Sequence, residues 1–198
     1  MVETFGNTKE ICMQTLVKEE YPHILYLYED AECYLKRALS FLKDSITAGE
    51  PVLLVENERN YQKLKAELSS CFSAEEMKLV NYANSISFYL SSGSYFPPAI
   101  ESYFNEVAKP YIEENIRFRS WAHVEWSTIN GSAHLVEQLE RIIDQAVKQY
   151  SFSLVCAYER SRTSDELMEA LLQTHPYIAK GDSVITSDTY RSNSEKNV

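Results

Sequence analysis

Short runs of hydrophobic residues alternate along this chain with longer segments in which hydrophobic positions recur every three or four residues. The runs have the length of strands that are covered on both faces, and the spaced positions form the stripe of an amphipathic helix. Five runs are predicted as strands: residues 23–28, 51–55, 79–82, 118–126 and 152–158. Strands that alternate with helices favour an α/β fold, with a mainly parallel sheet covered by helices on both faces.

Residues at the ends of the predicted helices support this division. Asp30 is placed to cap the helix after the first strand, and Gly49 follows that helix where a left-handed residue often ends it. Ser73 and Glu76 have the spacing of a capping box. Pro110 predicts a break or a kink in the helix before the fourth strand.

The length of 198 residues suits one domain with a sizeable core. Residues 1–20 hold only a weak helical pattern and are predicted as a helical lead-in. The single folded α/β domain is predicted to span residues 21–186. Residues 187–198 are polar and are predicted to form a disordered tail.

The chain is acidic, with a formal net charge of -10 and a pI near 4.9. It lacks a dense stripe of Lys and Arg that would neutralise a nucleic-acid backbone, which argues against direct DNA or RNA binding. No hydrophobic run reaches the roughly 18 residues of a membrane span, and the first residues lack the features of a secretory signal. We therefore expect a soluble cytoplasmic protein that does not bind membranes.

The spacing of cysteines and histidines does not indicate a metal centre. The four cysteines, Cys12, Cys33, Cys71 and Cys156, are scattered without a Cys-x-x-Cys pair. Three of the four lie in hydrophobic stretches of sequence typical of core residues. The histidines lack a close metal-ligand spacing: His23, His123, His134 and His175. The sequence predicts structural thiols, no metal site and no cofactor.

The first turn from strand to helix, at residues 28–32, is where a nucleotide-binding protein of this kind would carry its phosphate loop. Such a loop needs glycines, so that the backbone can approach the phosphates, and a lysine that reaches them. This turn instead holds Glu29, Asp30 and Glu32. The order of elements is that of a nucleotide-binding fold, but the residues at this turn would repel a polyphosphate.

Acidic residues follow most of the predicted strands: Glu29, Asp30, Glu56, Glu125 and Glu159. Ligands of open α/β sheets bind beyond the carboxyl ends of the strands, where these residues lie. The carboxylates fit three uses, which are helix capping, the edge of a partner or ligand site, and a metal or acid-base centre. Helix capping is favoured, because negative charge is stabilising in the first turn of a helix.

Aromatic residues belong to the same strands or to their ends: Tyr26, Tyr28, Trp121, Trp126 and Tyr158. They fit the wall of a pocket for a small organic molecule. They also fit core packing, which needs no ligand and is the favoured interpretation.

Five segments carry a likeness to a known family: residues 23–30 (HILYLYED), 49–55 (GEPVLLV), 119–126 (RSWAHVEW), 154–158 (LVCAY) and 174–176 (THP). In their order and spacing they resemble the MEDS family, the methanogen/methylotroph DcmR-like sensory domain. The resemblance covers roughly residues 23–179. It implies a three-layer RecA-like fold, similar to KaiC-like ATPases but without the phosphate loop. It also implies a non-catalytic sensory module, proposed to sense small organic compounds.

The positions that match the family by motif are His23, Tyr26, Asp30, Glu125, Tyr158 and His175. Together with Glu29 and Trp126 they are the predicted ligand- or partner-binding residues, and none is predicted to be catalytic. The chain departs from the family at residues 116–119 (IRFR), where such domains typically have a glycine. This departure implies a pocket that differs or is filled.

The sequence therefore predicts a non-enzymatic regulatory protein in signal transduction. Related domains are often joined to a histidine kinase or a helix-turn-helix, and 198 residues leave room for neither, so we expect a partner in trans, such as a histidine kinase or a transcription regulator. Its acidity would steer it to a basic partner surface. Two alternatives stay open: a degenerate nucleotide-binding protein or ATPase of RecA-like fold, and a sensor of a small organic ligand. Homo-oligomerisation is open as well.

Overall fold

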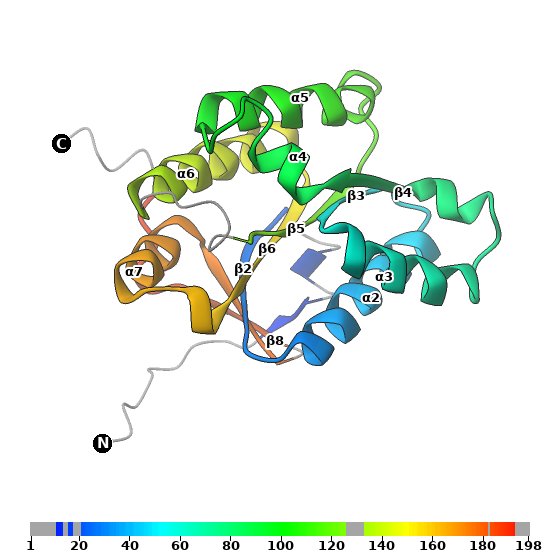
Figure 1. Cartoon of the computed structure of the whole chain (residues 1–198), viewed down its shortest axis with the longest axis horizontal. Coiled ribbons are helices and arrows are strands. Elements are labelled where there is room, and N and C mark those ends of the chain that lie inside the picture. The colour runs from blue at the N-terminus through cyan, green and yellow to red at the C-terminus, as the bar shows by residue number, and fades with distance from the viewer. Residues whose placement is uncertain (1–10, 14–15, 18–20, 126–132, 182, 193–198) are drawn as a thin grey trace.

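The structure is a computed structural model that describes residues 11–13, 16–17, 21–125, 133–181 and 183–192. These residues form one eight-stranded sheet between two layers of helices (Figure 1). The strands are β1 (Ile11–Cys12), β2 (His23–Tyr28), β3 (Val52–Glu56), β4 (Val80–Asn84), β5 (Arg119–His123), β6 (Ser153–Glu159), β7 (Tyr177–Lys180) and β8 (Ser183–Thr186).

The strands lie in the order β1-β8-β7-β2-β6-β5-β3-β4. The six strands from β7 to β4 run parallel, and β8 is antiparallel to both of its neighbours. In the central pair, His23 lies opposite Leu154 and Tyr28 lies opposite Glu159, so β2 and β6 begin and end together. The predicted mainly parallel α/β sheet is confirmed.

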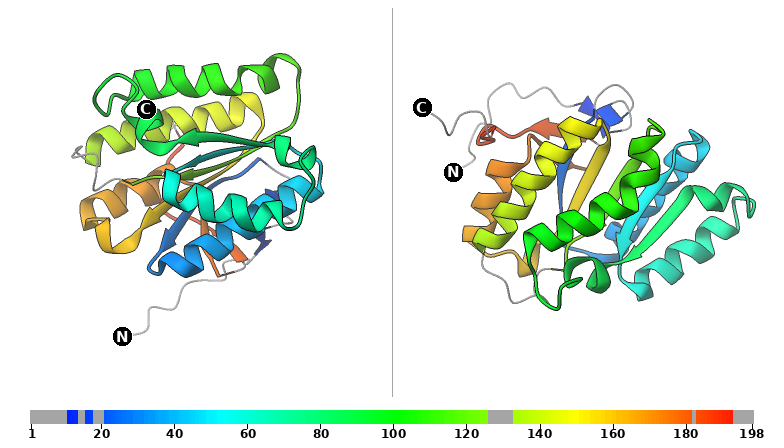
Figure 2. Two further views of the ribbon diagram at one scale, coloured as in Figure 1. Left: turned by 45° about the vertical axis from the view of Figure 1, so that its right-hand side comes forward. Right: turned by 90° about the horizontal axis from the view of Figure 1, so that it is seen from above.

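Helices cover both faces of the sheet, as the three-layer prediction requires. Figure 1 shows α5 and α6 on one side of the sheet and α2 and α3 on the other, and Figure 2 shows the same layers from two further directions. The α-helices of the described residues are α2 (Ala31–Thr47), α3 (Glu58–Ser69), α4 (Ser85–Tyr89), α5 (Pro97–Glu113), α6 (Ala133–Tyr150) and α7 (Asp165–Thr174). Two short 3-10 helices, Glu76–Leu79 and Arg160–Arg162, complete the connections.

Each face of the sheet has its own hydrophobic core, because successive side chains of a strand point to opposite faces. Ile24 packs with the core under α2 and α3, while its neighbour Leu25 packs with the core under α4 to α7. In β5, Trp121 faces α2 and Ala122 faces the opposite side. The side chains of one strand therefore take part in two separate environments.

Local signals place the helix ends where the sequence predicts them. The Asp30 carboxylate accepts the backbone amide of Cys33 at 2.7 Å and caps α2, and Gly49 follows that helix with a φ of +69°. Ser73 and Glu76 exchange hydrogen bonds as a capping box at the start of the first 3-10 helix. These ends depend on residues a few positions apart, so they are readable from the sequence.

Several predicted boundaries differ from the structure, and the sequence pattern did not predict α4, β7 or β8. Helix α5 continues through Pro110 to Glu113 rather than breaking there; Pro110 lies in the last turn, where a missing amide removes at most one helical hydrogen bond. Ile11–Cys12 is a strand instead of part of a helical lead-in, because it pairs with the distant β8. The fourth strand, predicted as 118–126, spans Arg119–His123, and residue 126 lies outside the described residues.

Residues 187–192, which the sequence assigns to the tail, contact the helices. Ser187 donates to the carbonyl of Leu172 at 2.7 Å, and the backbone amide of Arg191 donates to the carbonyl of Gln173 at 3.0 Å. These bonds attach the segment after β8 to α7. Among the described residues, none of the helices combines the length and the hydrophobicity needed to cross a membrane.

Candidate functional site

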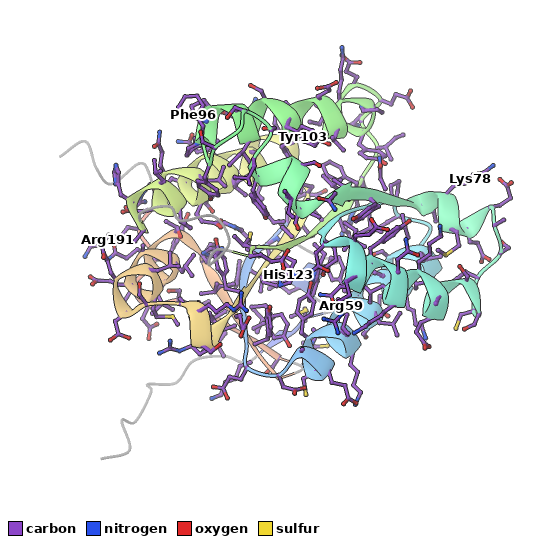
Figure 3. The ribbon with its side chains drawn as sticks, in the orientation of Figure 1. Arg59, Lys78, Phe96, Tyr103, His123 and Arg191 are labelled. Carbon is purple, nitrogen blue, oxygen red and sulfur yellow. The ribbon has the colours of Figure 1, made fainter. Side chains whose placement is uncertain are left out.

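The carboxyl ends of the parallel strands carry a network of hydrogen bonds around Glu56, the last residue of β3. Glu56 is fully buried, and one of its carboxyl oxygens lies 2.6 Å from Nδ1 of His123 in β5. The other ring nitrogen of His123 lies 2.7 Å from the hydroxyl of Tyr28. The backbone amide of Asn57 also donates to Glu56, at 2.8 Å. His123 lies near the centre of the molecule (Figure 3).

The network continues into an aromatic layer beneath α2. The indole Nε1 of Trp121 donates to the hydroxyl of Tyr34 at 3.1 Å, and that hydroxyl donates to Glu56. Tyr26, one of the predicted site residues, is half-buried, and its ring meets that of Trp121 edge-on at 5.8 Å. Burial raises the pKa of Tyr34 and Tyr28, so both hydroxyls stay protonated and serve as hydrogen-bonding groups.

Glu125 lies at the same edge of the sheet, two residues past the end of β5. Its two carboxylate oxygens accept from the side chains of Asn57, at 3.1 Å, and Ser85, at 2.9 Å. Beside it is a pocket of about 90 Å³, lined by Tyr28, His123, Val124, Glu125, Tyr158, Glu159, Arg162 and Thr163. We call this the edge pocket; its polar lining suits a small hydrogen-bonding molecule.

A second polar group lies on the opposite face of the sheet, under α6 and α7. We call it the Glu140 cluster, and its members are His23, Glu140, Asp144, Cys156, Tyr158 and His175. All six are buried. One carboxylate oxygen of Glu140 lies 3.3 Å from Nε2 of His23 and 3.4 Å from Nε2 of His175, and the other accepts from the Tyr158 hydroxyl.

Burial and charge act against each other in the Glu140 cluster. Burial lowers the pKa of His175 to about 4, so this imidazole is neutral at physiological pH. Burial also works to lower the pKa of His23, but its interactions with Asp144 and Glu140 outweigh burial and raise that pKa. Burial works to raise the pKa of Glu140, but the imidazoles of His175 and His23 lower it. The cluster therefore holds a charged carboxylate in the core.

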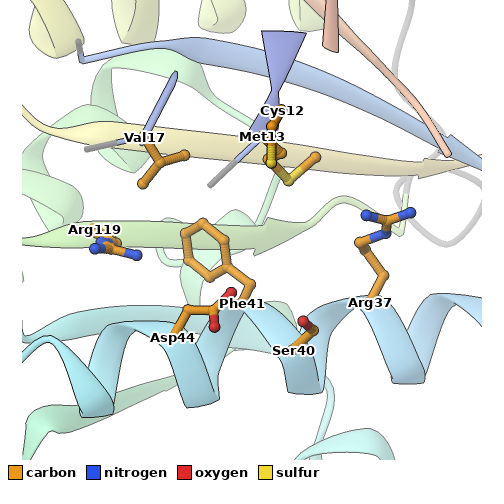
Figure 4. A pocket seen from close by; sticks show the side chains of 8 residues that line it. All are labelled: Cys12, Met13, Val17, Arg37, Ser40, Phe41, Asp44 and Arg119. Atoms are coloured by element: carbon orange, nitrogen blue, oxygen red, sulfur yellow. The ribbon is translucent and has the colours of Figure 1, made fainter. Parts of the chain in front are cut away.

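A third feature is the pocket between the amino-terminal segment and α2, which we call the amino-terminal pocket. It has a volume of about 260 Å³ and is lined by Cys12, Met13, Val17, Arg37, Ser40, Phe41, Asp44 and Arg119. Figure 4 shows Ser40 and Phe41 projecting from α2 towards Met13 and Val17. Arg119 pairs with Glu50 and lies at one end of the pocket, where the family resemblance implied an altered or filled pocket.

The structure separates the predicted site residues into groups. His23, Tyr158 and His175 meet in the Glu140 cluster. Tyr158 also lines the edge pocket together with Glu125, and Tyr26 belongs to the aromatic layer. Glu29 and Asp30 are exposed at the head of α2 and belong to none of these groups. Trp126 lies outside the described residues.

Sequence reasoning did not select the residues at the centre of each group. Glu56 was noted only as one of five carboxylates at strand ends, and Tyr34, Glu140 and Asp144 were not selected at all. Glu140 and Asp144 are four residues apart in α6, beside its hydrophobic stripe, and this spacing is the signal that marks a buried acidic pair.

The prediction of structural thiols is wrong for most of the cysteines. Cys156 is buried in β6, whereas Cys12, Cys33 and Cys71 are exposed. Cys33 lies in the first turn of α2, and Cys71 lies just after α3. Both side chains face solvent, although their neighbours in sequence are hydrophobic.

Comparisons with known proteins agree with the fold. The structure is similar to that of a KaiC-like protein from the hyperthermophilic archaeon Pyrococcus horikoshii OT3, with a TM-score of 0.58 and 13% identity over 86% of this chain and 79% of that one. At this identity the likeness shows the fold alone, which is RecA/KaiC-like. No curated protein matches the chain.

The family comparison covers most of the chain. Residues 22–176 match the MEDS family, described as the MEthanogen/methylotroph, DcmR Sensory domain. This range includes β2 to β6, the Glu140 cluster and the edge pocket, and it agrees with the resemblance seen in the short motifs. A domain of this family has a sensory or regulatory role in general. The chain belongs to the MEDS family of sensory domains.

Proposed function

We propose that this sensory domain acts without catalysis, by binding a signalling protein in trans under the control of a small organic ligand. The partner is a protein such as a histidine kinase or a transcription regulator. The observation that carries the proposal is the head of α2, where the Asp30 carboxylate accepts the amide of Cys33 at 2.7 Å. The helix start that would bind a nucleotide phosphate is thus capped by the chain's own anion.

Electrostatics at this turn also oppose a nucleotide. The backbone hydrogen bond from Cys33 lowers the pKa of Asp30, which keeps its carboxylate charged at neutral pH. Glu29 and Glu32 are exposed on either side of it. Three like charges repel a polyphosphate, and residues 28–32 contain neither a glycine nor a lysine that would offset them.

Calorimetric titration of the purified protein with ATP or ADP and Mg²⁺ is therefore expected to show no saturable binding. A triple variant, Glu29→Gln with Asp30→Asn and Glu32→Gln, removes the charge but keeps the backbone, and it is also expected not to bind. Binding by the variant alone would assign the exclusion to charge rather than to the missing loop. Saturable binding by the unmodified protein would support the alternative of a RecA-like ATPase, and turnover relative to Glu125→Ala would then decide.

The amino-terminal pocket supports the ligand part of the proposal. Met13, Val17 and Phe41 offer a hydrophobic surface, and the charged lining residues are Arg37, Asp44 and Arg119, the last of which pairs with Glu50. This combination suits a small molecule with an aliphatic body and one anionic group. Such a ligand would contact both α2 and the segment next to β1, so its binding would stabilise the arrangement in which these two parts pack together.

Short aliphatic carboxylates, from propionate to hexanoate, are expected to raise the melting temperature of the protein, whereas amines of the same length are not. Ser40→Tyr places a larger side chain in the pocket and should abolish the shift. Ser102→Tyr, at another exposed serine on α5, is the matched control and should keep it. An equal shift in both variants would show that these carboxylates bind elsewhere.

The partner part of the proposal is supported by the net charge of -10, which steers association towards a basic surface. A signalling protein recovered from native lysate should bind the purified chain directly, and that binding should weaken as salt is added. Its affinity should also change when the pocket ligand is present. A recovered protein whose affinity ignores the ligand would contradict ligand control.

A further inference from the structure

Four potential metal ligands converge inside the Glu140 cluster. They are Nε2 of His23 in β2, a carboxylate oxygen of Glu140 in α6, Sγ of Cys156 in β6 and Nε2 of His175 after α7. All four atoms lie within 4.8 Å of one another, and each residue is at most 3% exposed. Four separate elements of the fold thus direct one donor atom each to a common point.

Four of the six separations between these atoms match the edges of a tetrahedral site, and the two that join His175 to His23 and to Cys156 are at most 4.8 Å. Zinc bonds of about 2.0–2.2 Å to nitrogen and oxygen and about 2.3 Å to sulfur place tetrahedral ligands about 3.4–3.6 Å apart. Glu140 Oε2 lies 3.3 Å from His23, 3.4 Å from His175 and 3.6 Å from Cys156 Sγ. Cys156 Sγ lies 3.5 Å from His23 Nε2. The donor atoms need little movement to surround an ion.

The outer atoms of these side chains are held as metal ligands usually are. Nδ1 of His175 donates to the carbonyl of Leu171 at 2.8 Å, which directs the lone pair of Nε2 into the cluster. That Nε2 is buried and has no hydrogen-bond partner among the described residues. Tyr158 donates to the second oxygen of Glu140, and Asp144 lies 3.5 Å from Nδ1 of His23. The bonds of His175 and Tyr158 orient donors towards the centre, and the Asp144 carboxylate faces His23 without a hydrogen bond.

Charge also favours an ion at this point. One carboxylate and one thiolate balance a divalent cation, and two neutral imidazoles add no charge, so the complete site is neutral in the core. Lys148 lies 2.8 Å from Asp144 and neutralises the remaining carboxylate. Without an ion, the carboxylate of Glu140 faces the unprotonated Nε2 of His175, which is an unfavourable meeting of two acceptors.

We propose that His23, Glu140, Cys156 and His175 form a tetrahedral zinc site that ties β2, β6, α6 and the end of α7 together. A thiolate with two imidazoles selects zinc over magnesium or calcium, which prefer oxygen ligands. Four protein ligands with no open position are typical of structural zinc rather than catalytic zinc. The inference is independent of the proposed partner and ligand, because it concerns a different face of the sheet. Binding releases to solvent the proton of the Cys156 thiol and, where His23 is protonated, the proton on its Nε2.

The test uses the full chain produced in medium that contains Co²⁺ or Zn²⁺, because a buried site loads during folding or local opening. The expected result is one metal ion per chain by elemental analysis. The cobalt protein should show the intense visible absorption of tetrahedral Co²⁺ and a thiolate charge-transfer band. X-ray absorption of the zinc protein should find one sulfur and three nitrogen or oxygen neighbours.

Variants separate this site from adventitious binding. Cys156→Ser and His175→Gln should reduce the affinity for the metal by about 100-fold or more, since changes at residues that only hydrogen-bond to a metal ligand already reduce it about 10–100-fold. Cys71→Ser and His134→Gln, at exposed positions, are matched controls and should bind like the unmodified chain. Circular dichroism identifies any variant that fails to fold. In that case the sulfur count of the unmodified zinc protein decides the question.

Three results would overturn the proposal. The first is a chain that contains no stoichiometric metal after growth in cobalt or zinc and after refolding with either ion. The second is bound metal without a sulfur neighbour. The third is binding that survives Cys156→Ser but is lost in Cys71→Ser, which would place the ion on the surface.

Discussion

Replacing Glu56 with alanine is expected to lower the free energy of unfolding by about 3–5 kcal/mol, because several buried donors lose their acceptor at once. The hydroxyl of Tyr34, Nδ1 of His123 and the amide of Asn57 all bond to this carboxyl group. Glu56 itself is fully buried, so water cannot readily replace it. Each buried donor that is left without an acceptor lowers the free energy of unfolding by about 1–3 kcal/mol.

Urea unfolding of three variants gives the comparison. Glu56→Gln keeps the shape and part of the bonding, and we expect a loss of about 1–2 kcal/mol. Glu67→Ala removes an exposed carboxylate from α3 and is expected to stay within about 0.5 kcal/mol of the unmodified chain. If Glu56→Ala behaved like Glu67→Ala, the network would not contribute to stability as its geometry indicates.

Trp121→Ala is expected to lower the free energy of unfolding by about 3–5 kcal/mol, the usual range for removal of a large buried aromatic side chain. Trp121 is fully buried, and its ring lies 5.2 Å from that of Phe41 and 6.1 Å from that of Tyr34. Its indole nitrogen also donates to the Tyr34 hydroxyl. The substitution removes both the packing and the hydrogen bond.

Trp121→Phe separates these two contributions, because it keeps one aromatic ring and loses the donor. We expect this variant to lose about 1–2 kcal/mol, and Phe96→Ala, at a ring that is 52% exposed, to change stability by less than about 0.5 kcal/mol. Urea unfolding followed by circular dichroism measures all three. Equal losses for Trp121→Ala and Phe96→Ala would contradict the assigned packing.

The two sites are also expected to interact. Tyr34 bonds to both Trp121 and Glu56. The double variant Glu56→Ala with Trp121→Ala should therefore lose less free energy of unfolding than the sum of the losses of the two single variants. Strict additivity would show that Tyr34 does not transmit the effect of one residue to the other.

Most of the fold could be predicted from short stretches of sequence. The alternation of hydrophobic runs and helical stripes identified five of the six parallel strands, β7 being the exception, and Asp30 and Gly49 marked the two ends of α2. These features depend on backbone preferences and on side-chain bonds that span a few residues. β1, β7 and β8 were not predicted, and β1 in particular forms only by pairing with β8, which joins residues about 170 positions apart in the chain.

The candidate sites were less predictable. Glu29, Asp30, Glu56, Glu125 and Glu159 follow strands that end at one edge, yet their side chains have different environments. Glu56 points into the core, and the side chain of Glu159 pairs with Arg162. The side of the sheet that a strand residue faces depends on its register within the sheet, because a shift of one position reverses every side chain.

Periodicity and capping residues in the chain were enough to specify the α/β class, the order of the elements from β2 to α7 apart from α4, and the acidic turn that replaces a phosphate loop, because these are properties of neighbouring residues. The meeting of His23 with His175, whose ring centroids are 4.0 Å apart, depended on the pairing of β2 with β6 and on the docking of α6 and α7. Contacts of this kind have no local signal, since the packing of distant elements brings the side chains together and sets their burial.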